Sequence, residues 1–375
     1  MLQRQFVILT SVLAAAMAIP AQESTSLKDA YRGDFYIGVA LNANQITGTD
    51  VHGAQIAVEQ FNAISPENVL KWEKVHPQPN SYDFKLADQY VDFGTRHHMF
   101  ILGHTLVWHS QTPSWVFQNE QGGTISREAL LQRLHDHIFT VVGRYKGRIQ
   151  SWDVVNEALN DDGTLRESKW KQIIGPEYLI YAYRWAHEAD PAAELNYNDY
   201  NLENPAKRQG ALRLIKTLQA NGIHIAVVGI QGHDSLTWPS MNLEEQTIED
   251  FAALGVKIAI TELDLDVLPS VSQATTADVS YHVESDPKLN PYVHGLPESV
   301  QKKLTEQYAN LFRVYLKHKN VMSRVTLWGV ADADSWRNDW PVQGRTSYPL
   351  LFDREDKPKP AFYAVLQVAS EVPHK

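Results

Sequence analysis

Two glutamates carry the chemistry that this sequence suggests most clearly. Glu157 follows the buried-strand pattern of SWDVVNEALN, and Glu262 lies in the later run ITELD. A polar group buried without a partner costs about 2–7 kcal/mol, so carboxylates and amides in such runs favour strand ends that do chemistry. One carboxyl group can donate a proton while another attacks as a nucleophile. A structural salt bridge is the alternative for either glutamate alone, but carboxylates with perturbed titration cluster at functional sites.

The two glutamates fall on the fourth and seventh of eight predicted strands. Short β-branched or aromatic runs alternate with long segments of helical period, such as the one in which Leu130, Leu134, Ile138 and Val142 share a face. The predicted strands are 35–41, 63–71, 100–107, 149–156, 194–200, 226–233, 257–264 and 324–330. Such alternation predicts an α/β fold with parallel strands. Eight units favour a closed (β/α)₈ TIM barrel over an open doubly wound sheet, and no GxGxxG follows the first strand.

In such a barrel, the loops after the carboxyl ends of the strands build the site. The predicted strand ends carry carboxylates, amides, His and Trp: ENVLKWE, GHTLVWHSQTPSW, WDVVNEA, NYNDYN, GIQGHDS, ITELDLD and LWGVADADSWR. Sugar hydroxyls need amide and carboxylate partners, and the C–H faces of pyranose rings lie against indoles. Trp108, Trp328 and Trp336 are the candidate platform, with core packing as the alternative for each. Glu157 and Glu262 would face each other across this mouth, where two carboxyl groups can bracket a glycosidic bond.

Histidine is frequent, with 15 residues, but no HExxH or similar spacing indicates a metal site. His233 could hydrogen-bond Glu262 and hold it ionised, and His104 could contact a sugar hydroxyl. Four others lie in helical, charge-rich stretches and are expected to face solvent: His97, His98, His135 and His137. No cofactor is implied, and a structural Ca²⁺ stays open because its oxygen ligands leave no compact motif.

Composition narrows the partners. The chain has 375 residues, no Cys and a net charge of -10, which argues against nucleic acid or an anionic membrane and favours a neutral polymer or small molecule. Its length suits one large domain. The longest irregular segment, residues 267–297, follows the seventh strand on the side where a barrel forms its site, and loops of this length are usually functional or disordered.

The first residues, MLQRQFVILTSVLAAAMAIPAQES, have the layout of a secretory signal peptide: a polar start with Arg4, an apolar run and small residues. The apolar run is short of the roughly 20 residues of a membrane span, although a membrane anchor or a buried helix is the alternative. We therefore expect a signal peptide over 1–21 and one catalytic domain over 22–375. The mature chain is expected to be secreted or periplasmic, monomeric and not held in a membrane.

The motifs together closely resemble glycoside hydrolase family 10, the endo-β-1,4-xylanases. WDVVNEA, ITELD, ENVLKWE, GHTLVWHSQTPSW and WGVADADSWR occur in the family's order, over about 38–368. The resemblance implies hydrolysis of internal β-1,4-xylosidic bonds of xylan by a retaining, double-displacement mechanism. Glu157 matches the family's general acid/base, and Glu262 matches its nucleophile.

The resemblance also implies roles for other residues. Asn156 would hydrogen-bond the 2-hydroxyl of the sugar at the cleavage point, and His233 and Asp264 would support the nucleophile. The implied substrate-binding residues are Glu67, Asn68, Lys71, His104, Trp108, Gln111, Gln231, Trp328 and Trp336 around the glycone, with Asn198 and Tyr200 on the other side. The long segment 267–297 departs from a minimal family member, which leaves leaving-group contacts open. A β-1,4-glucanase and a carbohydrate-binding protein without catalysis are the alternatives, and the presence of both glutamates argues against the second.

Overall fold

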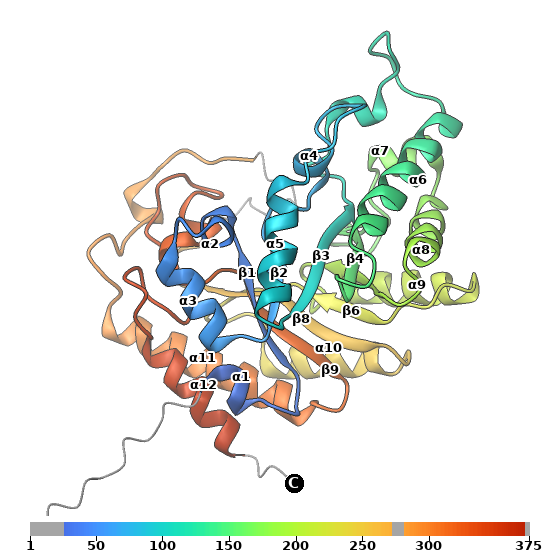
Figure 1. Cartoon of the computed structure of the whole chain (residues 1–375). Helices are drawn as coiled ribbons and strands as arrows, with labels where there is room; N and C mark the ends of the chain where they lie inside the picture. Colours follow the sequence, from blue (N-terminus) through green and yellow to red (C-terminus); the bar gives the residue numbers. More distant parts are fainter. Residues whose placement is uncertain (1–25, 272–280, 372–375) are drawn as a thin grey trace, which may run out of the picture.

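The predicted (β/α)₈ barrel is confirmed in the computed structural model, which describes residues 26–271 and 281–371 (Figure 1). Strands β1 to β6 pair in parallel, each with the next, and the pairings β6–β8, β8–β9 and β9–β1 close the ring, while β7 pairs with β8 alone. The strands are β1 Tyr36–Leu41, β2 Ala63–Pro66, β3 Phe100–Val107, β4 Ser151–Asn156, β5 Glu194–Asp199, β6 Val227–Ile230, β7 His233–Ser235, β8 Lys257–Asp266 and β9 Met322–Leu327. All strand ends that carry the predicted site residues therefore meet at one rim of the barrel.

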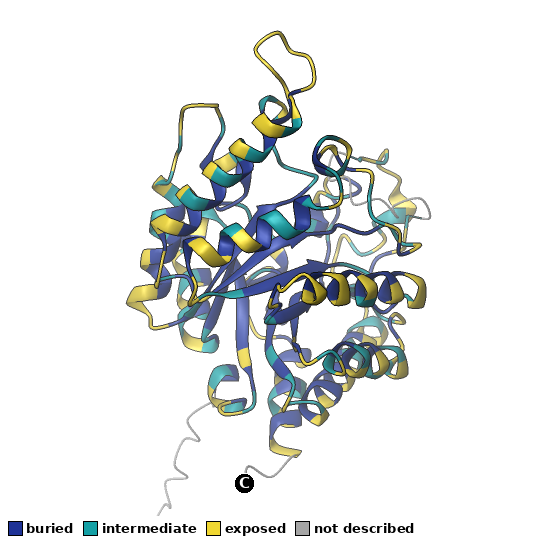
Figure 2. Ribbon diagram, turned by 90° about the vertical axis from the view of Figure 1, so that its right-hand side faces the viewer, coloured by how far each residue is buried: buried dark blue, intermediate teal, exposed yellow. Residues whose placement is uncertain are grey.

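Helices surround the barrel and bury one face each against it, so that buried residues line the inside and exposed ones the outside (Figure 2). The longer helices are α3 Val51–Gln60, α5 Lys85–Arg96, α6 Arg127–Arg144, α8 Tyr178–Ala189, α9 Pro205–Ala220, α10 Met241–Ala252, α11 Glu298–Lys317 and α12 Pro360–Glu371. The short helices are α1 Leu27–Ala30, α2 Ala43–Thr47, α4 Trp72–Val75 and α7 Lys169–Ile174, with 3-10 turns η1 Ser114–Phe117, η2 Pro287–Leu289, η3 Asp332–Asp334 and η4 Trp336–Asn338.

Local chemistry explains where these helices begin. Ser126 caps α6 by accepting a hydrogen bond from the Ala129 N–H, and Asn204 caps α9, which starts with Pro205. The predicted apolar face of α6 is confirmed, since Leu130, Leu134, Ile138 and Val142 are all buried.

Most predicted strands differ from the observed ones by one to three residues at an end, and two differ more. The second, predicted over 63–71, ends at Pro66, and the chain then turns into α4 through a hydrogen bond from the Lys71 N–H to the Asn68 carbonyl. The sixth, predicted over 226–233, is broken into β6 and β7 because Gly232 adopts a positive φ of 74°, a conformation that favours glycine. Beyond this break, β7 pairs with β8 alone, and His233 lies beside Asp264.

Two segments singled out in the sequence extend beyond the described residues. The signal peptide expected over 1–21 lies wholly outside them. Of the long segment 267–297, residues 267–271 and 281–297 are described; Val283 bridges to Val342, and the Val283 N–H donates to the Pro341 carbonyl at 2.8 Å. The described end of this segment thus lies against the loop that follows β9.

The expectation that His137 faces solvent is wrong. His137 is fully buried in α6, and its ring stacks on Trp72 with centroids 3.5 Å apart and planes 4° apart. His76 stacks on Tyr82 at 3.8 Å, and the Nδ1 atoms of His76 and His137 lie 3.3 Å apart. Burial lowers the pKa of His137 well below its ordinary value, and the charge of His76 acts in the same direction. His137 is therefore neutral in the folded protein.

Because the neutral form is the one that folds, His137 should make stability depend on pH. A lowered folded-state pKa gives stability that is present above the unfolded pKa and lost as the pH falls below it. The free energy of unfolding should therefore decrease progressively as the pH falls below the ordinary histidine pKa of about 6.5. Urea unfolding of His137→Phe, which keeps a flat ring on Trp72, should show a weaker pH dependence than the unaltered chain. His135→Phe on the same helix is the control, and equal pH dependence in all three proteins would contradict the assignment.

Candidate active site

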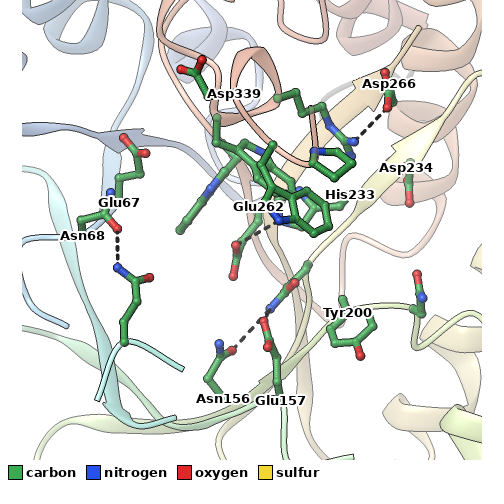
Figure 3. Close-up of a pocket in the computed structure, with 18 of the residues that line it drawn as sticks. Glu67, Asn68, Asn156, Glu157, Tyr200, His233, Asp234, Glu262, Asp266 and Asp339 are labelled. Atoms are coloured by element: carbon green, nitrogen blue, oxygen red, sulfur yellow. Dashed lines mark hydrogen bonds and ion pairs between the residues drawn. The ribbon is translucent and has the colours of Figure 1, made fainter. Parts of the chain in front are cut away.

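A cavity of about 850 Å³ opens at the carboxyl ends of the strands and gathers most of the predicted site residues. Figure 3 shows Glu157 and Glu262 near its centre, Glu67 and Asn68 on one side, and Tyr200 and Asp234 on the other. The predicted residues that line it are Glu67, Asn68, Lys71, His104, Trp108, Gln111, Asn156, Glu157, Tyr200, Gln231, His233, Glu262, Trp328 and Trp336. Asn198 and Asp264 lie behind the wall, where each bonds a residue that lines it.

Glu157 sits directly after β4 in the left-handed region of backbone space, with φ 55°. A non-glycine residue there costs roughly 1–2 kcal/mol, and a hydrogen bond from its N–H to the Asn198 carbonyl at 2.9 Å helps to hold it. Its carboxylate accepts hydrogen bonds from Trp108 Nε1 at 2.7 Å and from Gln231 Nε2 at 2.9 Å. Both donors are neutral groups.

Glu262 projects from the middle of β8, opposite β4 across the barrel. Its Oε1 accepts a hydrogen bond from Asn198 Nδ2 at 2.8 Å, and its Oε2 lies 3.2 Å from His233 Nε2. Unlike Glu157, this carboxylate has a histidine as one of its partners.

Asn156 lies between the two carboxylates in the hydrogen-bond network. Its side-chain oxygen accepts from Asn198 Nδ2 at 2.9 Å and from Gln231 Nε2 at 3.4 Å, and those amides also bond Glu262 and Glu157 respectively. With the oxygen used in this way, the Asn156 amide nitrogen is the group left to donate to a ligand in the cavity. The contact to a sugar hydroxyl that was expected for this residue stays a prediction.

Behind Glu262, a buried ionic group fixes His233. Asp264 Oδ1 lies 3.0 Å from His233 Nδ1 and 2.8 Å from Arg337 Nη2, and its Oδ2 accepts from Trp336 Nε1 at 2.7 Å. Arg337 also bonds Asp266 at 3.2 Å.

This arrangement sets the charges of the group. Burial alone would raise the pKa of Asp264, but Arg337 and His233 lower it to about 2. Burial would likewise lower the pKa of His233, but Asp264 and Glu262 raise it to about 9. His233 is therefore a cation at neutral pH and donates to both carboxylates.

The side of the cavity that carries Glu67 is built from polar side chains on the loops after β2 and β3. Lys71 Nζ donates to Asn68 Oδ1 at 3.0 Å and to Gln111 Oε1 at 2.8 Å. Burial lowers the pKa of Lys71, an effect that Glu262 and Glu67 oppose, and burial raises the pKa of Glu67 against the charge of Lys71. These groups can offer sugar hydroxyls both donors and acceptors.

Two more predicted residues complete that side. His104 Nδ1 lies 3.0 Å from the buried Asp153 carboxylate, which fixes the orientation of the ring. Trp328 meets the rings of both His104 and His233 edge-on, at 5.7 and 6.2 Å, and is only 7% exposed. Trp328 is thus a rigid wall of the cavity.

On the opposite side, Tyr200 is positioned by two cations. Arg166 Nη2 donates to its hydroxyl at 3.0 Å, and Lys207 Nζ lies 3.1 Å from its ring centroid. Lys207 is itself buried and paired with Asp199 at 2.9 Å.

Several residues of the site escaped sequence reasoning. Arg337, which bonds Asp264, directly follows Trp336 in the DADSWR segment, so its place at a strand end was the available signal. Arg166 and Trp238 carry no motif of their own, although Trp238 lines the cavity and Arg166 bonds Tyr200. Two predicted residues have unexpected partners: Trp108 and Gln231, expected around the sugar, both donate to Glu157.

Within residues 26–271 and 281–371, no group of three or more His, Cys, Asp or Glu is arranged to hold a metal ion. No helix in the same described ranges is long and apolar enough to cross a membrane.

Comparison with known proteins identifies the family. Residues 26–368 match the model of glycosyl hydrolase family 10. The chain belongs to glycosyl hydrolase family 10. Among family 10 relatives, it is 42% identical to endo-1,4-beta-xylanase A of Xylanibacter ruminicola over 364 residues, which cover 96% of this chain and 99% of that one. It is 41% identical to a beta-1,4-xylanase of Dictyoglomus thermophilum over 94% of this chain and 92% of the relative.

A solved family 10 structure supports the same assignment. The structure of an endoxylanase retrieved from sugarcane soil metagenome superposes on this chain with a TM-score of 0.88 and 49% sequence identity. The match covers 92% of this chain and 100% of the other. The resemblance seen in the motifs is thereby confirmed at the level of family and fold.

The ionic group behind Glu262 can be tested through His233. In the unaltered chain, the His233 ring should stay protonated at neutral pH and titrate near pH 9, because Asp264 and Glu262 raise its pKa to about 9. Two-bond ¹H–¹⁵N NMR of the imidazoles measures this, with the His233 signal assigned by its absence in His233→Asn. A midpoint below 7 would show that the two carboxylates do not hold the proton.

The same variant should lose catalytic rate. His233→Asn removes a preorganised donor to Glu262, and the loss of one such donor typically lowers kcat by about 100-fold or more. Circular dichroism and urea unfolding serve as controls for folding.

Proposed function

We propose that this protein is a retaining endo-1,4-β-xylanase in which Glu157 is the general acid/base and Glu262 the nucleophile. The observation that carries the proposal is the pair of carboxylates, each with its own donors, facing one cavity from the opposed strands β4 and β8. The two relatives described above support the proposal, because both are named as xylanases and both match nearly the whole chain. A binding protein would need no such pair.

In the first step, an ionised Glu262 oxygen attacks the anomeric carbon of a bound xylose residue. The bond from that carbon to the bridging oxygen breaks, and Glu157 transfers its proton to that oxygen, which leaves with the rest of the chain. Protonated His233 and the Asn198 amide hold the Glu262 carboxylate in place through hydrogen bonds. The product of this step is a glycosyl ester on Glu262 and an ionised Glu157.

In the second step, Glu157 removes a proton from a water molecule as that water attacks the anomeric carbon. The ester bond to Glu262 breaks, so both carboxyl groups return to their starting states and the β configuration is retained. Retention requires the carboxyl groups to lie about 5–5.5 Å apart when substrate is bound. NMR of the first-formed product tests this, because an α-anomer would exclude the two-step reaction.

Substrate class is tested by reducing-sugar release from soluble xylan beside a soluble cellulose derivative. We expect strong preference for xylan, and we expect Glu262→Gln to lower kcat on xylan by at least about 1,000-fold, since it removes the nucleophile. Preference for cellulose would reassign the protein as a β-1,4-glucanase with the same two glutamates. Absence of activity on both polymers would exclude a hydrolase of either kind.

Preference for xylose over glucose is proposed to depend on Trp328. Glucose carries a hydroxymethyl group that xylose lacks, and we expect the wall that Trp328 forms against His104 and His233 to exclude it. Trp328→Ala should raise the rate on 4-nitrophenyl cellobioside relative to 4-nitrophenyl xylobioside by about ten-fold or more. Trp185→Ala is a matched control, because that indole stacks on Tyr181 in α8 outside the barrel. An unchanged ratio would remove Trp328 from this role.

Processing and location follow from the substrate. We propose that residues 1–21 are removed as a signal peptide and that residues 22–375 act as a secreted or periplasmic monomer, because xylan is too large to enter a cell. The polar start, apolar run and small residues of the N-terminal segment support this. Mass spectrometry of the protein from the culture medium or periplasm measures its first residue, and light scattering measures its oligomeric state.

A further inference from the structure

The barrel divides the cavity into two halves on either side of the glutamates. Glu157 ends β4 and Glu262 lies on β8, so β5, β6 and β7 border one half and β9, β1, β2 and β3 border the other. Figure 3 shows this separation, with Glu67 and Asn68 to one side and Tyr200 and Asp234 to the other. The Glu67 half holds the dense polar set around Lys71, which suits the glycone. A polymer bound there must extend its leaving part into the half bordered by β5 to β7.

Trp238 lies on that leaving side. It closes a turn directly after β7, in which the Ser235 N–H donates to the Trp238 carbonyl at 2.8 Å and the Trp238 N–H donates to Ser235 Oγ at 3.1 Å. The turn is anchored next to the nucleophile, because His233 of the same short strand pairs with Asp264 of β8 and bonds Glu262. The turn therefore has a fixed place relative to the reacting groups.

The exposure of Trp238 sets it apart. All ten tryptophans lie within the described ranges, and this is the one of them that is exposed, at 39% of its surface. A single exposed indole on a protein surface needs no explanation by itself. This one, however, lines the same cavity as Glu157, Tyr200 and Asn201. A flat apolar ring in a cavity that also holds hydroxyl and amide groups matches a pyranose, which presents a C–H face with hydroxyls at its edge.

We propose that Trp238 is a stacking platform for a xylose residue of the leaving chain. This inference rests on the proposed function and deepens it, since it assigns a contact for the part of xylan that departs in the first step. The ring stacks on the apolar face of the sugar, and the binding energy holds the leaving chain across the cavity while Glu157 protonates the bridging oxygen. Trp238 thus favours long substrates cut at internal bonds.

The test compares two substrates that share a glycone and differ in the leaving group. Xylohexaose places sugars on both sides of the glutamates, whereas 4-nitrophenyl xylobioside replaces the leaving chain with a nitrophenol. Trp238→Ala should lower kcat/KM on xylohexaose by about ten-fold, in the range expected for loss of an aromatic contact. Its loss on the aryl xylobioside should be at least about five-fold smaller, and the cleavage positions in xylohexaose should shift.

Two further variants sharpen the comparison. Trp238→Phe keeps a flat ring and should recover most of the rate on xylohexaose. Tyr363→Ala removes an aromatic residue of α12 that is 58% exposed and does not line the cavity, so both rates should stay at the level of the unaltered chain.

The outcomes separate this inference from the proposed function. If the unaltered chain hydrolyses xylohexaose and Trp238→Ala matches it on both substrates, the platform is refuted. Equal losses on both substrates would also refute it, because they would indicate a structural role for the turn. If the unaltered chain hydrolyses neither substrate, the proposed function itself fails.

Discussion

The active-site side of this barrel depends on keeping one buried carboxylate ionised. Asp264 has no exposed surface, yet Arg337 and His233 lower its pKa to about 2. A buried charge is tolerated only when it is paired and hydrogen-bonded, and here the pairing also fixes three neighbours. His233 is held as a cation beside Glu262, Trp336 is held by its indole N–H, and the loop after β9 is tied to β8 through Arg337.

The closed sheet makes this cluster possible. Parallel strands bring all their carboxyl ends to one rim, so residues far apart in sequence meet there. Asn198 and Glu262 are separated by 64 positions and Arg337 and Asp264 by 73, yet each pair is in hydrogen-bond contact. The helices outside bury the apolar faces that stabilise the ring of strands. The rim can therefore carry charged and polar groups, and these offset the cost of their burial by pairing with one another.

The sequence was sufficient for the fold class and for bringing Glu157 and Glu262 to one cavity, because both depend on periodicity and on the position of a residue along its strand. It was not sufficient for contacts that depend on side-chain packing between strands, such as Arg337 with Asp264 or Trp108 with Glu157. The break at Gly232 was missed because a φ preference does not by itself decide where a strand ends. His137 was placed in solvent on residue type, although it lies three positions after Leu134 and four before Val141, on the buried face of α6.

The partners of the two glutamates differ in a way that suits the proposed division of labour. Glu157 receives hydrogen bonds from an indole and an amide, which are both neutral donors. Glu262 lies beside His233, whose pKa is raised to about 9 and which is therefore a cation at neutral pH. The residue that we propose to exchange a proton twice in each cycle thus has neutral partners, and the residue that we propose to attack the anomeric carbon has a charged one.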